Sequence, residues 1–443
     1  MKNRKLFIET YGCQMNFSDS EIVASILKEE GFETTTDIHA ADVVFINTCS
    51  IRNHAEQRIR KRLQYMNSLK RKKPGMIIGL LGCMAERLKI SLIEEEKVLD
   101  LVAGPDTYRD LPGLIANAES GQKAVNTILS AEETYADISP VRYSSNGVTA
   151  FISIMRGCEN YCAYCIVPMV RGQERSRDSE SIVAEARDLV EKGFREVTLL
   201  GQNVNSYSWK GKDGETGFAE LLAGVAAVSP LLRVRFATSH PKDLSDKVIK
   251  TIAEHSNICK SIHLPVQSGS NRMLDKMNRK YTREEYLERI SAIRRYLPDC
   301  SVSTDIITGF CDETEEDHRD TLSLMEEVGF DLAYMFMYSE RPGTLAAEHY
   351  QDNVPAEVKE KRLEEIIALQ QKNSWKSNKK EVGNTCQVLV EGHSKRSKEQ
   401  LFGRNTRNKV VVFPAGNHQP GDYVEVTIHK HTSATLIGDW TGK

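Results

Sequence analysis

The chain has 443 residues, of which 27% are charged and 40% are hydrophobic, and its formal net charge is −3. This length excludes one small domain and predicts two to four, because a single hydrophobic core seldom grows past roughly 250 to 300 residues. No apolar run approaches the roughly 20 residues of a membrane helix, so we expect a globular cytoplasmic protein without a membrane partner.

Residues 1–120 alternate short apolar segments with amphipathic ones, which predicts an open parallel α/β sheet. Ser18–Glu21 has the form of a capping box and predicts a helix start, and Gly31 is placed to end that helix. Residues 121–142 lack strong periodicity and are predicted to be a linker. The expected strands are Leu6–Ile8, Val43–Ile46 and Met76–Leu81.

Three dispersed cysteines, Cys13, Cys49 and Cys83, fall just past these strands, one strand–helix unit apart. Ligands of open α/β sheets gather outside the carboxyl ends of the strands, so we expect the three thiols at one edge. Gly12 and Gly82 beside them permit a close backbone approach to a bulky cofactor. Three unrelated buried thiols remain the alternative on spacing alone.

Residues 143–380 repeat the strand–helix alternation six times and end in a long helical pattern from Pro355 to Lys380. This predicts a partial (β/α)6 barrel. Polar residues follow the strands, at the C-terminal face where such barrels carry their chemistry. The expected strands are Phe151–Met155, Glu196–Leu200, Arg233–Ala237, Ser261–Leu264, Val302–Ile307 and Leu332–Met337.

A tight cysteine trio, Cys158-x3-Cys162-x2-Cys165, opens the loop after the first of these strands. Three thiolates from one loop suit an iron–sulfur cluster that keeps one iron free of protein ligands. Zinc is the less favoured alternative, because it prefers four ligands in two close pairs. The other cysteines, Cys259, Cys300, Cys311 and Cys386, are expected to be small buried residues.

Residues 381–443 are predicted to form five short strands and a small β-barrel of the nucleic-acid-binding kind. Turn signals occur at 391–392, 405–408, 417–421 and 432–433. Basic side chains surround Phe402, which predicts contact with an RNA backbone and a stacked base; they are Lys395, Arg396, Lys398, Arg404, Arg407 and Lys409. A second basic cluster, between Arg58 and Lys73, fits RNA and an ordinary solvated helix face equally well.

These features together resemble the radical S-adenosylmethionine superfamily, and the whole chain resembles its methylthiotransferases. The resemblance implies an N-terminal cluster domain at 1–120, a radical domain at 143–380 and a terminal TRAM domain at 381–443. The strings that carry it are Tyr11–Asn16, Asn47–Cys49, Gly82–Cys83, Met169–Gly172, His263–Ser270 and Tyr338–Thr344.

The resemblance implies two [4Fe–4S] clusters and S-adenosylmethionine. The tight trio would hold the cluster whose open iron binds S-adenosylmethionine and cleaves it reductively, with an electron from a donor such as flavodoxin or ferredoxin. The dispersed trio would hold an auxiliary cluster that carries or supplies the sulfur. A second S-adenosylmethionine would methylate that sulfur, and the cofactors carry the hard chemistry while the protein positions them.

By matching position, a set of residues is expected to face S-adenosylmethionine: Tyr164, Gln202, Asn203, Thr238, Ser239, Gln267 and Asp305. Each is alternatively a strand-end residue that satisfies loop backbone. The chain departs from the common family pattern at Phe310–Glu313, where a Pro-Gly pair is more usual.

Within the family, one branch acts on isopentenyladenosine beside the tRNA anticodon, another on threonylcarbamoyladenosine, and a third on an aspartate of a ribosomal protein. Asn47–Gln57 and Leu200–Asn205 look like the first branch. We therefore expect methylthiolation of carbon 2 of isopentenyladenosine, with the isopentenylated anticodon stem-loop of tRNA as partner. A non-catalytic iron–sulfur RNA-binding protein is the hypothesis of another class.

Overall fold

The computed structural model describes residues 4–49, 53–143, 145–212 and 214–441, and it leaves the side chains of 53–55 undescribed. Residues 50–52, part of the string that favoured the isopentenyladenosine branch, therefore lie outside the described residues. The chain divides into two compact units. The first unit comprises Met1–Ser144, Met155–Glu159 and Cys165–Arg177, and the second comprises Ser145–Ile154, Asn160–Tyr164 and Asp178–Lys443. The domain boundaries expected from the sequence stay predictions.

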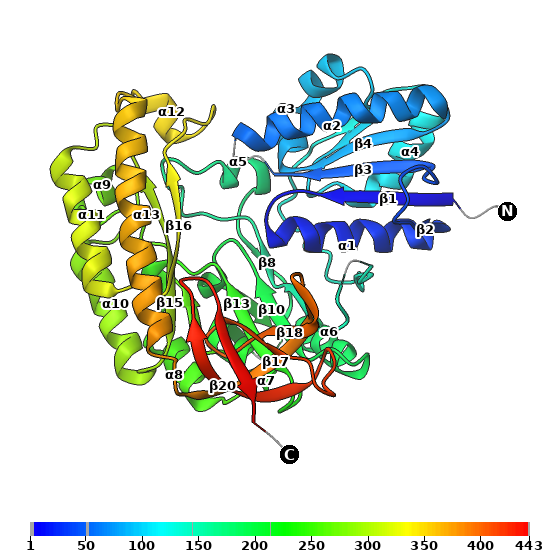
Figure 1. The fold of residues 1–443 in the computed structure, drawn as a ribbon. Helices are drawn as coiled ribbons and strands as arrows, with labels where there is room; N and C mark the ends of the chain where they lie inside the picture. The colour runs from blue at the N-terminus through cyan, green and yellow to red at the C-terminus, as the bar shows by residue number, and fades with distance from the viewer. Residues whose placement is uncertain (1–3, 50–52, 144, 213, 442–443) are drawn as a thin grey trace. The chain divides into compact units, whose positions relative to one another are not determined.

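The first unit is built on a six-stranded parallel sheet in the order β2-β1-β3-β4-β5-β6 (Figure 1). This confirms the open parallel α/β sheet. Its strands are β1 (Arg4–Thr10), β2 (Phe32–Thr34), β3 (Val43–Thr48), β4 (Ile77–Gly82), β5 (Leu101–Ala103) and β6 (Ala124–Asn126). Its helices are α1 (Gln14–Glu29), α2 (Asn53–Lys72), α3 (Cys83–Glu95), η1 (Tyr108–Asp110), α4 (Leu111–Glu119) and α5 (Val167–Arg171), and a short pair of strands, β8 (Met155–Arg156) and β9 (Arg175–Ser176), completes it.

Apolar side chains cover both faces of this sheet, as an all-parallel sheet requires. Ile22 and Leu27 of α1 and Leu111 of α4 pack with Phe45 on one face. Leu63 of α2 and other apolar residues of α2 and α3 pack on the opposite face. Figure 1 shows α1 and α2 on opposite sides of β1 and β3.

Several local features of this unit were not predicted. Helix α1 begins at Gln14, one turn before the capping box that Ser18 suggested. Ser20, inside the helix, instead accepts a hydrogen bond from the Asn47 amide at 2.9 Å, so the polar run anchors the helix to β3. Strand β6 lies within the stretch expected to be a linker, and the three-residue strands β2 and β5 were missed.

The second unit contains two three-stranded parallel sheets, β13-β10-β7 and β14-β15-β16, joined by a bridge between Val234 and Ile258. All six expected strands are present, which confirms the partial barrel. They are β7 (Thr149–Ser153), β10 (Glu196–Leu200), β13 (Arg233–Ala237), β14 (Ser261–His263), β15 (Ser301–Thr308) and β16 (Leu332–Met337), and a hairpin of β11 (Ser208–Gly211) and β12 (Gly214–Gly217) is added to them.

Helices cover the outer side of these strands (Figure 1). Phe236 of β13 packs edge-on against Phe218 of α7, with ring centroids 5.3 Å apart, which marks the covered side. The residues that alternate with it, such as Arg235, point to the inner side. The helical elements are α6 (Ser179–Glu191), η2 (Val204–Ser206), α7 (Phe218–Ala226), η3 (Pro241–Asp243), α8 (Asp246–Glu254), α9 (Asn271–Lys276), α10 (Arg283–Tyr296), α11 (Glu315–Val328), α12 (Leu345–His349) and α13 (Ala356–Lys379).

The chain ends in a closed five-stranded barrel in the order β17-β18-β19-β21-β20, as expected. One turn signal was misread: Glu391-Gly392 forms an irregularity inside β17, and the chain reverses between Ser394 and Ser397. The strands are β17 (Thr385–Ser394), β18 (Ser397–Arg404), β19 (Val410–Pro414), β20 (Tyr423–His431) and β21 (Leu436–Trp440).

This terminal barrel docks on the N-terminal ends of the second unit's parallel strands. The Tyr423 hydroxyl donates to the carbonyls of Arg195 and Leu231, the residues that precede β10 and β13. Glu196, the first residue of β10, is fully buried and pairs with Arg235 at 2.7 Å and with Arg404 of the barrel at 2.8 Å. Burial raises the pKa of Glu196, but these guanidiniums outweigh it and hold the pKa below its usual value.

Replacement of Glu196 by Ala should lower the free energy of unfolding by about 3–5 kcal/mol, because it leaves Arg235 buried without its carboxylate. Chemical denaturation of the two proteins measures the difference. The exposed Glu399→Ala is the control, and it should change stability by no more than about 0.5 kcal/mol. Equal effects of the two substitutions would contradict the docking role of Glu196.

Candidate cofactor site

The dispersed cysteines lie at the carboxyl ends of three adjacent strands. Cys13 caps α1 directly after β1, Cys49 follows β3, and Cys83 is the first residue of α3 after β4. Strands β1, β3 and β4 are parallel neighbours, so the three residues share one edge of the sheet. Cys13 is exposed, and Cys49 and Cys83 are buried.

Backbone contacts hold these three loops close together. The Tyr11 N–H donates to the Asn47 carbonyl at 2.8 Å, and the Thr48 hydroxyl donates to the Leu81 carbonyl at 2.7 Å. Gly12 has a φ of +120°, and a Cβ added there would lie 2.5 Å from the Cβ of Cys49. Only glycine permits that approach, so the glycine beside Cys13 brings two of the cysteine loops into contact.

A buried charge network lies beside the dispersed trio. Asp19, fully buried, accepts from Arg156 Nη1 at 2.9 Å and pairs with Arg171 Nη2 at 2.8 Å. Asp106 pairs with Arg175 at 3.0 Å. Three buried guanidiniums therefore face two buried carboxylates, and the surplus positive charge favours an anionic neighbour.

The Cys83 thiol lies close enough to Arg171 for their charges to interact. Burial raises the pKa of Cys83, and the charge of Arg171 opposes that rise. Arg171 Nη1 is buried and has no hydrogen-bond partner in the described structure. The guanidinium is thus available to an anionic sulfur at Cys83.

Two of the three cysteines of the tight trio, Cys158 and Cys165, belong to the first unit. Ile166, which follows Cys165, packs with Cys83 and Val170. The Cys158 N–H donates to the Gly172 carbonyl at 3.2 Å. Gly157 has a φ of +78°, and a Cβ there would overlap the Gln173 carbonyl, so this position also requires glycine.

Cys162 belongs to the second unit, where the loop around it is fastened to other segments. The Ala163 N–H donates to the Met277 carbonyl at 2.9 Å, and the Ala163 carbonyl accepts from the Ala346 N–H at 2.7 Å. The Cys162 sulfur lies 3.2 Å from Nη1 of Arg279. Arg279 was absent from the sequence-based site, although it stands in a basic Asn278–Lys280 run.

Three of the residues expected to face S-adenosylmethionine carry buried oxygens that have no hydrogen-bond partner among the residues the structure describes. These atoms are Gln202 Oε1, Ser239 Oγ and Gln267 Oε1. They follow β10, β13 and β14 respectively, at the carboxyl ends of the strands. Buried acceptors normally find donors, so orphan oxygens at three strand ends mark a place where a ligand with N–H or O–H groups would be satisfied.

The backbone is strained at the same strand ends. Thr238 has a φ of +70° and Gln267 a φ of +73°, both in the left-handed region. This conformation is a genuine outlier for a β-branched residue such as threonine. Such strain persists only where surrounding structure enforces it, and it concentrates at ligand sites.

The remaining expected cofactor residues have partners within the protein. The Asn203 amide donates to Asp243 at 2.7 Å and its oxygen accepts from the His240 N–H at 3.1 Å. The Tyr164 hydroxyl lies 3.3 Å from Arg279 Nη1. Asp305 Oδ1 lies 3.4 Å from His263 Nε2. Asn203 thereby shapes the loops after β10 and β13 from within the protein.

Sequence reasoning missed two residues near this set. Asn205 is partly buried, and within the described part of the chain neither polar atom of its side chain has a hydrogen-bond partner. His263 lies in β14 and bonds Ser303 at 3.0 Å. Asn205 stands in the Leu200–Asn205 string and His263 in the His263–Ser270 string, both of which carried the resemblance. Their position after or at the end of a parallel strand was the available signal.

The basic residues of the terminal barrel fall into two groups. Lys395, Arg396 and Lys398 lie at the exposed reversal between β17 and β18. Arg404, Arg407 and Lys409 instead form ion pairs: Arg404 with Glu196 and Glu391, Arg407 with Glu381, and Lys409 with Asp331 and Glu381. Phe402 is half-buried between the two groups along β18. RNA contact by all seven stays a prediction.

The second basic cluster is also partly paired. Within α2, Arg60 pairs with Glu95 and Glu96, Arg62 with Glu9, and Lys70 with Asp100. Arg71 and Lys72 at the end of the helix are exposed. A solvated, ion-paired helix face accounts for most of this cluster.

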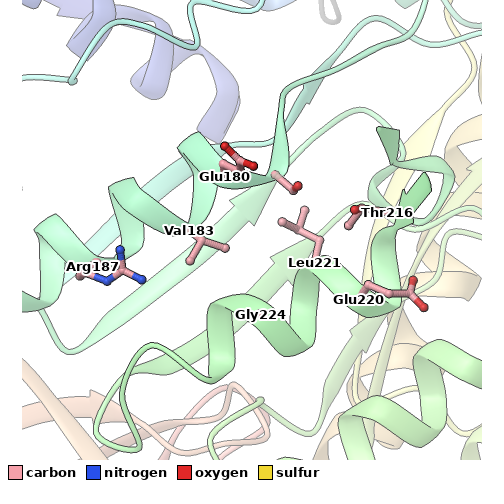
Figure 2. A pocket seen from close by; sticks show the side chains of 8 residues that line it. Glu180, Val183, Arg187, Thr216, Glu220, Leu221 and Gly224 are labelled. Atoms are coloured by element: carbon pink, nitrogen blue, oxygen red, sulfur yellow. The ribbon is translucent and has the colours of Figure 1, made fainter. Parts of the chain in front are cut away.

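Within the described part of the chain, no three His, Cys, Asp or Glu side chains are grouped closely enough to hold a single metal ion. A cubane differs, because its cysteine ligands bind separate irons across the cluster. A surface hollow of about 410 Å³ lies between α6 and α7 and is lined by Val183, Arg187, Glu220 and Leu221, among others (Figure 2). None of its lining residues belongs to the expected site.

Three family models match the chain. Residues 5–104 match the uncharacterised protein family UPF0004, residues 152–325 match the radical SAM superfamily, and residues 379–441 match the TRAM domain. The order of these matches agrees with the resemblance inferred from the cysteine motifs.

Full-length relatives decide the family. The tRNA-2-methylthio-N(6)-dimethylallyladenosine synthase of Amoebophilus asiaticus is 59% identical over 98% of this chain and 92% of its own length. The enzymes of the same name from Parabacteroides distasonis and Bacteroides fragilis are 59% and 58% identical, over 98% and 99% of this chain and 95% and 96% of their own lengths. The chain belongs to the tRNA-2-methylthio-N(6)-dimethylallyladenosine synthase family.

Solved structures are similar in fold to this synthase-family chain. The radical S-adenosylmethionine methyltransferase TsrM of Kitasatospora setae, solved with cobalamin and a [4Fe–4S] cluster, has a TM-score of 0.57 at 13% identity, covering 78% of this chain and 74% of TsrM. The cobalamin-dependent radical enzyme OxsB has a TM-score of 0.53 at 14% identity, covering 83% of this chain and 56% of OxsB. These matches, with the family models, confirm the expected fold class.

Membership of the radical SAM superfamily implies a [4Fe–4S] cluster and S-adenosylmethionine. The residues of this synthase-family chain fit both groups. The tight trio offers three free thiols for the cluster, and the orphan oxygens of Gln202, Ser239 and Gln267 match the donors of S-adenosylmethionine. The cysteine-rich loops and the acceptor-rich strand ends therefore suit the cofactors that the family uses.

Replacement of Asp19 by Ala should lower the free energy of unfolding by about 3–5 kcal/mol, because Arg156 and Arg171 would lose their shared buried carboxylate. It should also reduce the iron that the reconstituted protein takes up, because Arg171 would lose the carboxylate that holds it beside Cys83. The exposed Glu29→Ala in the same helix is the control. Denaturant titration and iron analysis test both effects, and parent-like values for Asp19→Ala would contradict the network's role.

Proposed function

We propose that the protein adds a methylthio group to carbon 2 of isopentenyladenosine next to the tRNA anticodon. The observation that carries this proposal is the name shared by relatives that are 57–59% identical over nearly the whole chain. Dimethylallyladenosine in that name is the isopentenylated nucleoside expected from the sequence. Neither the threonylcarbamoyladenosine branch nor the ribosomal-protein branch is favoured by these relatives.

Two [4Fe–4S] clusters are part of the proposal. Cys158, Cys162 and Cys165 would hold the first, and Cys13, Cys49 and Cys83 would hold the second. The grouping of the dispersed trio at one sheet edge supports the second cluster, and the surplus positive charge around Arg171 supports an anionic group there. When bound, the clusters and S-adenosylmethionine supply radical chemistry and sulfur.

The chain's own residues bind and orient the cofactor. Gln202, Ser239 and Gln267 would accept hydrogen bonds from S-adenosylmethionine through their orphan oxygens. The strained backbones of Thr238 and Gln267 hold these groups at the strand ends. Asn203 keeps two of the loops in place through Asp243 and His240, and Tyr164 and Asp305 would border the cofactor.

RNA is the proposed macromolecular partner. The exposed residues Lys395, Arg396 and Lys398 suit phosphate contacts at the tip of a TRAM hairpin. A flavodoxin- or ferredoxin-like donor would deliver electrons. None of the helices in the described part of the chain has the length and apolar character needed to cross a bilayer. A tRNA substrate is consistent with the proposed cytoplasmic location.

Reconstituted protein should methylthiolate tRNA that carries the isopentenyl group and leave matched tRNA without it unmodified. The isopentenyl group, which is the dimethylallyl group in the relatives' name, distinguishes the proposed substrate from unmodified adenosine. Mass spectrometry of digested nucleosides measures the product. Equal product from both tRNAs, or product only on a ribosomal protein, would contradict the proposal.

Substitution of one cysteine in each trio should separate the two clusters. Cys162→Ala should abolish reductive cleavage of S-adenosylmethionine, and Cys49→Ala should mainly remove sulfur insertion. Each variant should retain about four irons, against about eight in the parent, as two cubanes require. Cys386→Ala, in the terminal barrel, is the control and should keep the parent's iron. Identical iron content in all the variants would refute the assignment.

A further inference from the structure

Arg279 is a buried cation whose four polar contacts include no carboxylate. Its side chain donates from Nε to the Tyr281 hydroxyl at 3.0 Å and from Nη2 to the Pro265 carbonyl at 2.7 Å. Its Nη1 faces the Tyr164 hydroxyl at 3.3 Å and the Cys162 sulfur at 3.2 Å. Among the residues that the structure describes, Arg279 makes no ion pair with an acidic side chain.

Two other buried arginines of the second unit have acidic partners. Arg235 pairs with Glu196 at 2.7 Å, and Arg362 pairs with Glu313 at 2.9 Å. An unpaired charge is unfavourable in a protein interior, because no opposite charge compensates for the lost hydration. Arg279 is only 4% exposed. Its neutral partners satisfy its N–H groups, but they do not balance its charge.

The surroundings of Arg279 do not supply that balance. His240, stacked edge-on against Tyr281, is neutral, because burial and the nearby charges of Arg279, Lys242 and Lys280 lower its pKa to about 2. The local field is therefore positive. Among the described side chains that Arg279 contacts, the sulfur of Cys162 is the one that becomes anionic in the function proposed above, because a metal-bound cysteine is a thiolate.

We propose that Arg279 is the counter-charge and hydrogen-bond donor of the Cys162 thiolate, and that it raises the reduction potential of the cluster held by the tight trio. The inference rests on the proposed function, because it takes Cys162 as a cluster ligand. A cation and an N–H···S bond at a ligand sulfur stabilise the reduced, more negative cluster. Arg279 is thus a positioning residue that acts through Cys162.

The same geometry explains how Arg279 keeps its place. Its guanidinium donates to the Pro265 carbonyl through Nη2 and to the Tyr281 hydroxyl through Nε. That hydroxyl in turn donates to the Val266 carbonyl at 2.8 Å. Pro265 and Val266 lead into Gln267, one of the orphan acceptors. One arginine therefore links the loop of the tight trio to the loop expected to hold S-adenosylmethionine.

The test uses the full chain in a Cys13→Ala, Cys49→Ala, Cys83→Ala background, which leaves only the cluster of the tight trio. Arg279→Met removes the charge and the donors but keeps the bulk, and Arg279→Lys keeps the charge. After anaerobic reconstitution, iron content is measured, and the midpoint potential is obtained by dye-mediated titration followed by electron paramagnetic resonance. Arg235→Met, at a buried arginine in the middle of β13 that pairs with Glu196, is the matched control.

Arg279→Met should shift the midpoint potential to more negative values, Arg279→Lys should shift it less, and Arg235→Met should leave it at the parent's value. Loss of iron from Arg279→Met, with circular dichroism like the parent's and recovery of iron in Arg279→Lys, would also support the proposal. A parent-like potential in Arg279→Met overturns it, including the case in which only the affinity for S-adenosylmethionine falls. If the protein with the three alanine substitutions and an intact Arg279 takes up no iron, the proposed function itself is overturned.

Discussion

The constraint on which this structure depends is the parallel direction of its strands. Parallel neighbours send every following loop to the same edge, so residues far apart in sequence meet without any long-range recognition of their own. In the first unit this brings Cys13, Cys49 and Cys83 to one sheet edge. In the second it places Gln202, Ser239 and Gln267 beyond three strands of a partial barrel. The candidate site residues of both units therefore lie in short loops that follow rigid strands.

Buried charge is arranged around both cysteine sets. Arg171 lies beside Cys83, and Arg279 lies beside Cys162, each almost fully buried. Asp19 holds Arg171 and Arg156 in place, whereas Arg279 relies on neutral oxygens. Cationic surroundings of this kind stabilise thiolates and the anionic clusters that they bind. Each unit therefore places a buried guanidinium beside a cysteine. A carboxylate holds the guanidinium in the first unit, and neutral oxygens hold it in the second.

Much of this fold was predictable because its elements are long or strongly patterned. β10, β13 and β16 have the bounds that their apolar runs indicated, and α13 lies within one residue of its predicted range. The three-residue strands β2, β5 and β6 were missed, since so few residues carry no period. The helix start at Gln14 was missed because the polar run at Ser18–Glu21 lies inside the helix, where Ser20 bonds to Asn47 of β3 instead of capping. For the site, spacing predicted the cysteines, but no local pattern reveals a partner such as Arg279, which packing across loops selects.

The sequence did not show which basic residues of the terminal barrel are exposed and which form ion pairs within the protein. Charge alone does not distinguish a phosphate contact from an ion pair with Glu196. That docking has a geometric consequence. The terminal barrel is fastened where the strands begin, and the orphan oxygens stand where they end. The two are separated by the length of a strand, about 17–20 Å. A free nucleoside is too short to touch both, so any substrate that the barrel holds while it reacts at those strand ends must extend well beyond a single nucleoside.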